Sequence, residues 1–145
     1  MEHYDHAQMT GLHAARNAAG ANKPYTHLSN FWSEMLDLGI EFEAVGNISS
    51  QLPTVGYWDI GKTVYDVPSD GVPSFVSNEY HKGVVYYLDK ERKKVVGVLM
   101  WNMDGQLGKA REIMSSEKVL RDPIFDLRSL IKPEGSSLES VMVSN

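Results

Sequence analysis

The chain has 145 residues, of which 42% are hydrophobic and 10% aromatic, and it carries a net charge of −5 with no cysteine. This length and composition suit one domain with a sizeable core, which excludes a wholly disordered chain, and the acidic balance disfavours nucleic-acid binding by whole-surface attraction. The lack of cysteine excludes disulfides, zinc–thiolate sites and cysteine nucleophiles, and no apolar run approaches the ~20 residues needed to cross a bilayer.

The first expected element is a helix over residues 2–19. At 100° per residue, small side chains share one face of this helix. They are Ala7, Gly11, Ala14, Ala15 and Ala18, in line with Tyr4, and Gly20 follows as a helix stop. Because such a face admits an unusually close neighbour, we expect it to pack tightly against another segment or domain.

The same segment holds His3, His6 and His13, three of the five histidines of the chain. His6 and His13 would lie about 10 Å apart along a helix, too far to share one ion. His3 and His6, with Glu2 beside them, lack the i and i+4 spacing of helical zinc ligands. We therefore predict no metal site, and we interpret His6 and His13 as solvated or hydrogen-bonded side chains.

Segments rich in aromatic and β-branched residues follow, and they alternate with turn signals. Residues 29–35, 40–47 and 52–60 are predicted to be short strands. Residues 61–79, rich in Pro, Gly, Ser and Asp, are predicted to be a long loop. Residues 82–102 contain two apolar runs joined by the charged turn DKERKK, a pattern that predicts an antiparallel hairpin.

Two short amphipathic helices are predicted after the hairpin. The first covers residues 104–114 with Asp104 as its N-cap, and the second covers residues 122–131 with Pro123 in its first turn. Residues 135–145 are expected to form a disordered tail. Together these elements predict an α+β domain: an antiparallel sheet of about five strands with an N-terminal helix and two short C-terminal helices.

The sequence contains no GxSxG, Walker or GxGxxG motif, so no catalytic residue is predicted. Trp32, and Trp101 beside Asn102, lie near strand ends where a side chain can face a cleft, although core packing is the commoner role of tryptophan. A group of basic residues forms either a phosphate-binding patch or an ordinary solvated hairpin tip. Its members are Lys90, Arg92, Lys93 and Lys94 in the turn, with Lys109 and Arg111 nearby.

Several blocks of the sequence, taken in order, resemble one family. They are EHYDHA, KPYTHLSNFWSEM, FEAVG, SQLPTVGYW, KGVVYYL and VVGVLMWN, and they extend from about residue 2 to about residue 114. On these blocks the chain resembles the C-terminal domain of the apoptosis-inducing factor family, mitochondrial flavoproteins of the glutathione reductase-like superfamily. The resemblance implies that residues 1–145 are a single C-terminal domain of the FAD/NAD-linked reductase dimerisation type, preceded by FAD- and NADH-binding domains in a longer flavoprotein.

The resemblance also implies a set of cofactor-lining residues. Glu2, His3 and Tyr4 would lie where the N-terminal end of the first helix points at the flavin. Trp32 would stack near the flavin and the nicotinamide, and Glu43 and Asn102 correspond to positions that contact bound dinucleotide. Because FAD and NAD(H) carry the hydride-transfer chemistry in the full-length protein, these residues orient cofactors, and we expect the isolated domain to bind neither cofactor and to be inactive.

Partners and location follow from the same resemblance. The domain would pack on the FAD and NADH domains of its own chain, in a protein of the mitochondrial intermembrane space that reaches the nucleus in apoptosis and contributes to caspase-independent cell death. The alternative function is an interaction module that binds an apoptotic nuclease, another protein or DNA independently of redox chemistry. The small-residue face of the first helix also predicts self-association of the isolated domain.

Overall fold

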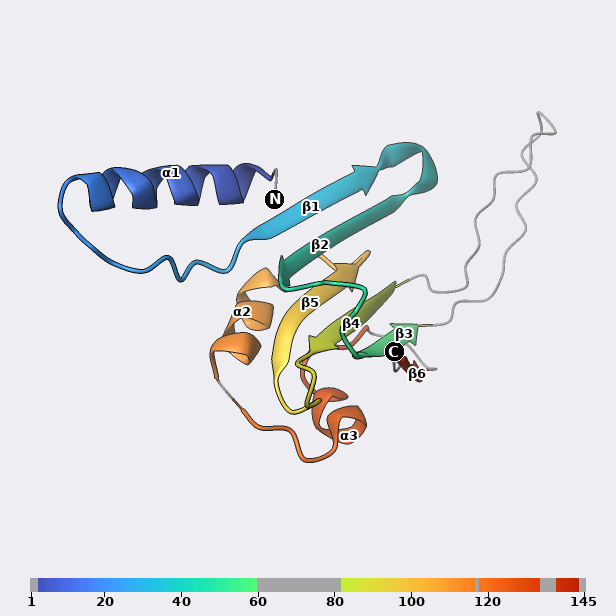
Figure 1. Cartoon of the computed structure of the whole chain (residues 1–145). Coiled ribbons are helices and arrows are strands. Elements are labelled where there is room, and N and C mark those ends of the chain that lie inside the picture. Colours follow the sequence, from blue (N-terminus) through green and yellow to red (C-terminus); the bar gives the residue numbers. More distant parts are fainter. Residues whose placement is uncertain (1–2, 60–81, 117, 134–137, 144–145) are drawn as a thin grey trace.

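The computed structural model describes residues 3–59, 82–116, 118–133 and 138–143 (Figure 1). Glu2 and the predicted loop over residues 61–79 lie outside the described residues. Within the described ranges the α-helices are α1 (Tyr4–Ala18), α2 (Leu107–Ser115) and α3 (Pro123–Leu127), and η1 (Leu36–Leu38) is a 3-10 helix. The strands in the same ranges are β1 (Asn30–Met35), β2 (Ile40–Gly46), β3 (Thr54–Asp59), β4 (Lys82–Leu88), β5 (Val95–Trp101) and β6 (Leu138–Val143).

The strands form one antiparallel sheet in the order β1-β2-β5-β4-β3-β6. This arrangement confirms the predicted α+β class with an N-terminal helix and short C-terminal helices. The hairpin predicted over residues 82–102 is the β4–β5 pair, and a second hairpin, β1–β2, joins it through pairing of β2 with β5.

The structure differs from the sequence-based prediction in the tail. Residues 138–143 form β6, which pairs with β3 from Thr54 opposite Val143 to Asp59 opposite Leu138, so this part of the expected disordered tail is a strand. The physical reason is the edge of β3, where unpaired N–H and C=O groups accept another strand from far along the chain. Local composition carries no information about such an edge.

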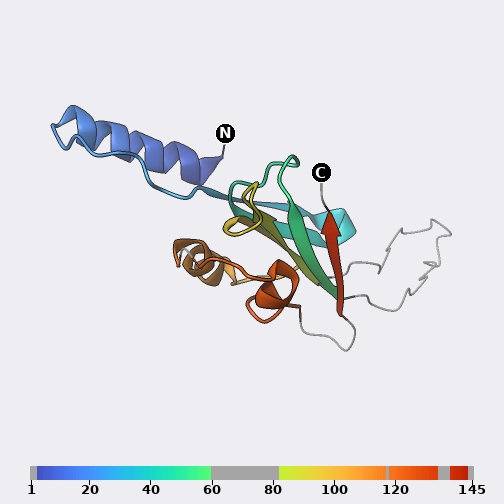
Figure 2. The same ribbon diagram turned by 60° about the horizontal axis from the view of Figure 1, so that its bottom comes forward.

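The core lies on the face of the sheet that α2 and α3 cover (Figure 2). One row of side chains crosses five strands on this face, because Trp32, Glu43, Met100, Val84 and Tyr57 are successive cross-strand partners. The last three are fully buried, whereas Trp32 is 56% exposed. This row of side chains, the core row, therefore begins in the core and ends at a solvent-exposed side chain on the edge strand β1.

Two buried tyrosines tie the segment around α3 to this core. The Tyr57 hydroxyl donates to the carbonyl oxygen of Ile124, and burial, more than the nearby charges, raises the pKa of Tyr57 to about 12. The Tyr86 hydroxyl donates to the Ile131 carbonyl oxygen at 2.8 Å and accepts from the Ile131 N–H at 2.7 Å. These hydrogen bonds matter because the core excludes water. Without them, the buried hydroxyl and backbone groups would have no hydrogen-bond partner.

The N-terminal end of helix α1 lies near the start of β1, and the rest of the helix extends away from the sheet, outside the core (Figure 1). None of the residues of α1 is buried. Its small side chains are exposed, and a Cβ atom placed on Gly11 would meet nothing within 4 Å. The helix prediction is thus confirmed, while the close neighbour expected for its small face is not supplied by the described residues. Packing of this face on another domain stays a prediction.

The caps of the two C-terminal helices differ from the prediction in one case. Helix α2 begins at Leu107 after Gln106, with no side-chain cap bond, so the prediction of Asp104 as its N-cap is wrong. The reason is that Gly105, at φ 72°, turns the chain between Asp104 and the helix. Helix α3 has Asp122 as its N-cap, whose carboxylate accepts from the Phe125 N–H at 3.3 Å, with Pro123 in the first turn as predicted.

Candidate functional site

The open end of the core row borders a cavity of about 250 Å³. Trp32 and Glu43 face each other across β1 and β2 and both line this cavity, with Met100 behind them in the next strand. Because neighbouring positions on two paired strands place their side chains on the same face, the register alone brings Trp32 and Glu43 together. The structure thus unites two of the predicted cofactor-lining residues.

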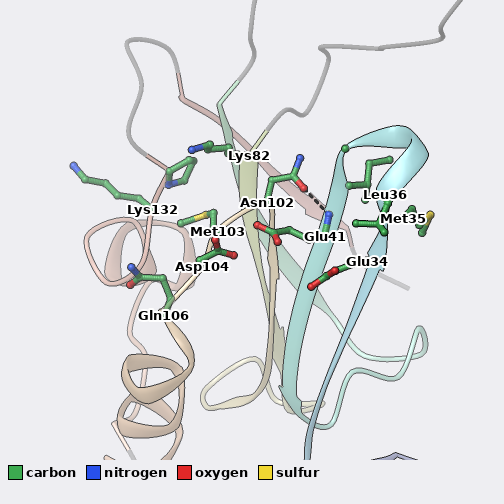
Figure 3. Close-up of a pocket in the computed structure, with 13 residues that line it drawn as sticks. Glu34, Met35, Leu36, Glu41, Lys82, Asn102, Met103, Asp104, Gln106 and Lys132 are labelled. Carbon is green, nitrogen blue, oxygen red and sulfur yellow. Dashed lines mark hydrogen bonds between the residues drawn. The ribbon is translucent and has the colours of Figure 1, made fainter.

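A larger cavity of about 670 Å³ adjoins the first (Figure 3). The two cavities share Glu34, Glu41, Met103 and Asp104 in their linings. Figure 3 shows the Glu41 carboxylate near Asp104, with Glu34 on the neighbouring strand. Lys82 and Lys132 also line this cavity. The two cavities therefore form one continuous acidic region at the end of the sheet that carries Trp32.

Asn102 lines the larger cavity but has a structural role there as well. Its Oδ1 accepts from the Glu41 N–H at 2.8 Å, and its own N–H donates to the Glu41 carbonyl oxygen at 2.8 Å. Asn102 has φ 50°, a left-handed conformation that asparagine tolerates better than most residues. These two bonds hold the chain beside β2 at the point where β5 ends, and Asn102 does not line the smaller cavity that Trp32 borders.

The carboxyl groups of this region raise one another's pKa values. The pKa of Glu41 is raised above its usual 4.5, first by a hydrogen bond with Asp104, then by burial and by the charges of Asp104, Glu34 and Glu43. Burial, followed by the charge of Asp104, raises the pKa of Glu43. Within the described part of the chain, Glu43 Oε2 is a buried acceptor with no hydrogen-bond partner. The site therefore concentrates negative charge and leaves one oxygen ready to accept a hydrogen bond.

Because of this acidic region, we expect the free energy of unfolding of the domain to increase when the pH is lowered mildly. Because the pKa values of Glu41 and Glu43 are raised in the folded chain, the unfolded chain releases these protons more readily, and stability falls as the pH rises through the raised values. We expect a higher free energy of unfolding at about pH 5 than at about pH 7 in urea titrations, with less of this difference in the variant Glu41→Gln. Glu112→Gln, at an exposed position of α2, is the control. If it and Glu41→Gln change the pH dependence of the free energy of unfolding equally, the assignment is incorrect.

The remaining predicted cofactor residues lie on or before α1. The His3 ring stacks on Phe31, with centroids 4.4 Å apart and an interplanar angle of 10°. Phe31 and Trp32 are neighbours in a strand and point to opposite faces, so His3 and Trp32 approach β1 from its two sides. Tyr4 is 67% exposed and its hydroxyl accepts from Gln8 at 2.7 Å, and no side-chain contact with the cavities involves it among the described residues.

The structure divides the predicted basic patch. Lys90, Lys93 and Lys94 are exposed at the turn between β4 and β5, and Arg92 is half-buried there. Lys109 is exposed on α2, but Arg111 on the same helix points inward and donates to Leu28 O at 3.2 Å and Asn30 Oδ1 at 2.7 Å. Arg111 therefore serves an internal contact, and the basic surface is smaller than the sequence suggests.

In the described ranges, no three or more His, Asp or Glu side chains are arranged to hold a metal ion. In the same part of the chain, none of the helices combines the length and the apolar character needed to span a bilayer.

Sequence reasoning missed a polar cluster that connects α1 to the sheet. Asp5 Oδ2 accepts from His27 Nε2 at 2.7 Å and from the Asn30 N–H at 3.0 Å. The ring of Tyr25 lies edge-on to His6 and His13, at centroid distances of 6.1 and 5.2 Å. These partners are separated by many residues in sequence, so neither helical nor strand periodicity could have identified them.

The sequence of this chain is similar to one protein family and to known proteins of two organisms. A family model described as "Apoptosis-inducing factor, mitochondrion-associated, C-term" matches residues 14–73 and 63–116. "Putative apoptosis-inducing factor 1, mitochondrial" of Drosophila melanogaster is 34% identical over 155 residues, covering 84% of this chain and 20% of that protein. "Apoptosis-inducing factor 1, mitochondrial" of Dictyostelium discoideum is 36% identical over 124 residues, covering 84% of this chain and 21% of that protein. The chain thus spans about a fifth of the length of these relatives.

Proposed function

Since this chain belongs to the apoptosis-inducing factor family, as its C-terminal domain, we propose that it forms one wall of the FAD and NAD(H) site in a longer NADH-dependent flavoprotein. The observation that carries the proposal is the pairing of Trp32 with Glu43 at the mouth of one cavity. An indole face that is half exposed beside a cavity offers a surface on which a flat ring can stack.

The charge of the site supports a nicotinamide ring as the group that stacks there. An oxidised nicotinamide ring is a cation, and both an indole face and nearby carboxylates attract a cation. Glu43 supplies a buried oxygen, without a partner among the described residues, that suits an N–H or O–H donor of a bound dinucleotide. The residues present therefore fit the cofactor that the family implies.

The chemistry in this proposal belongs to the cofactors, which exchange hydride and electrons when they are bound. The chain contributes orientation and electrostatics: Trp32 limits the tilt of a stacked ring, and Glu43 and Glu41 determine the local charge. His3 would contribute at the opposite side of β1, at the N-terminal end of α1, where helix N–H groups favour an electron-rich partner. None of these side chains is proposed to act as an acid or a base.

The setting of this function is part of the proposal. The printed names of both relatives describe mitochondrial apoptosis-inducing factors. On that basis we propose that the full-length protein is mitochondrial, acts in redox metabolism there, and contributes to cell death after release to the nucleus.

The test replaces Trp32 in the full-length flavoprotein. Trp32→Ala is expected to lower kcat/KM for NADH about two- to tenfold, the range that corresponds to one aromatic stacking interaction of about 0.5–1.5 kcal/mol, and to change the visible spectrum of the flavin. Steady-state reduction of an artificial electron acceptor and absorbance spectroscopy measure the two effects.

The matched control is Phe125→Ala. Phe125 is another exposed aromatic residue, at 76%, but it lies on α3 away from both cavities. It should leave rate and spectrum unchanged. If Trp32→Ala also leaves both unchanged, this wall does not face the cofactors and the proposed function is wrong.

A further inference from the structure

The contacts that hold α1 against β1 are few and polar. The helix buries no residue, so hydrophobic burial contributes little to its position. The Asp5 carboxylate makes the shortest of its side-chain bonds to the rest of the chain, at 2.7 Å to His27 Nε2, and a second bond of 3.0 Å to the Asn30 N–H. His6 adds one hydrogen bond, from Nδ1 to Ser29 Oγ at 2.9 Å. Near the other end of the helix, Asn17 donates to the Lys23 carbonyl oxygen at 2.8 Å and accepts from the Lys23 N–H at 2.9 Å. The position of the N-terminal end of α1 therefore depends mainly on the Asp5 carboxylate.

The Asp5 cluster also reaches the helix that covers the core. Arg111 on α2 donates to Asn30 Oδ1 and to Leu28 O, the same short segment that Asp5 holds from the other side. Burial raises the pKa of Asp5, but the hydrogen bonds from His27 and Asn30 and the charges of His27 and Arg111 together lower it below its usual 3.8. Asp5 on α1 is thus an ionised acceptor for His27 and for the first residue of β1, Asn30. Arg111 on α2 acts on Asp5 through its charge and binds the same segment through Leu28 and Asn30.

The cluster is close in sequence to two residues that the proposed function assigns to the cofactor site, His3 and Trp32. Asp5 is two residues after His3, and Asn30 is two residues before Trp32. The bond from the Asn30 N–H to Asp5 consequently links the two segments at their site-bearing ends, where the His3 ring also stacks on Phe31. A change in this bond would move His3 relative to Trp32.

We infer that Asp5 is a positioning residue, whose carboxylate fixes the N-terminal end of α1, and with it His3, against the edge strand that carries Trp32. Asp5 itself does not line either cavity. Its importance for a cofactor rests on the proposed function, whereas its control of the His3 position can be tested without any cofactor.

The experiment measures the stacking of His3 on Phe31 in the 145-residue chain by NMR, through NOEs between the two rings. Asp5→Ala is expected to abolish these NOEs while the amide NOEs between β4 and β5 persist, because that hairpin is held by its own strand pairing. Asp5→Asn keeps an oxygen that can accept one of the two bonds and is expected to retain part of the intensity. The matched control is Asp37→Ala, an exposed acid in η1, which should leave the stack intact.

A pH titration adds a readout that a purely steric role of residue 5 would not change. The charged or titratable groups that face Asp5 are His27, from the segment before β1, and Arg111, from α2. Because the pKa of Asp5 is lowered, its bonds persist at neutral and mildly acidic pH and are lost as the pH falls through that value. The native chain should lose the ring NOEs in this acid range before the β4–β5 NOEs, whereas the Asp5→Asn variant should show no such step.

The outcomes separate this inference from the proposed function. If Asp5→Ala retains the His3 to Phe31 NOEs at full intensity, Asp5 does not position α1 and the inference is overturned. The cofactor role is judged separately, by His3→Ala in the full-length flavoprotein: an unchanged flavin spectrum there counts against the proposed role of His3 and leaves the NOE result for Asp5 standing.

Discussion

Replacing Gly97 with alanine is expected to destabilise the domain by about 3 kcal/mol, the upper end of the usual cost of overpacking. A Cβ atom at position 97 would lie 2.2 Å from the Asn47 carbonyl oxygen and 2.6 Å from its carbonyl carbon. Both are backbone atoms, so no side-chain rotation relieves the clash. Gly97 pairs with Gly46 at the junction of β2 and β5, the pairing that joins the two hairpins.

Thermal and urea unfolding of the Gly97→Ala variant measure this effect. A loss of about 3 kcal/mol corresponds to a fall in Tm of about 10 °C for a domain of this size. Gly108→Ala is the matched control, because a Cβ atom there would meet nothing within 4 Å and the position lies in α2. Alanine in that helix should be neutral or stabilising by up to about 1 kcal/mol. Equal stabilities of the two variants would show that Asn47 does not press on Gly97.

Replacing Tyr86 with phenylalanine is expected to cost about 2–4 kcal/mol, since one buried donor and one buried acceptor each lose a partner. The Tyr86 hydroxyl bonds both the N–H and the carbonyl oxygen of Ile131, and both residues are almost fully buried. The effect should reach the larger cavity, because Lys132 and Pro133 follow directly and line it.

Urea unfolding of Tyr86→Phe tests this expectation, with Tyr87→Phe as the control. Tyr87 is the next residue of β4 and is half-buried on the opposite face, where its hydroxyl has no bond to another described residue. Its replacement should change the free energy of unfolding by less than about 0.5 kcal/mol. If both variants lose the same free energy of unfolding, the hydrogen bonds between Tyr86 and Ile131 do not contribute the expected stability.

Periodicity and turn chemistry were sufficient for the local elements. Residues 4–18 form a helix and residues 82–102 a hairpin because each pattern is repeated several times within its own segment. Asp104 was misjudged as an N-cap because the local pattern cannot distinguish an acid that caps a helix from one that faces another acid, here Glu41 from a strand about sixty residues earlier.

The sequence by itself determined the fold class, the ends of the strong elements and, through its family blocks, the choice of Trp32 and Glu43. Only the tertiary structure decided which of these residues meet. Strand register places Trp32 opposite Glu43, pairing of β2 with β5 sets both at the open end of the core row, and Asp5 reaches His27 and Asn30 to hold His3 at the same edge. Register and long-range hydrogen bonds depend on how distant segments pack, and that information is absent from any single stretch of the chain.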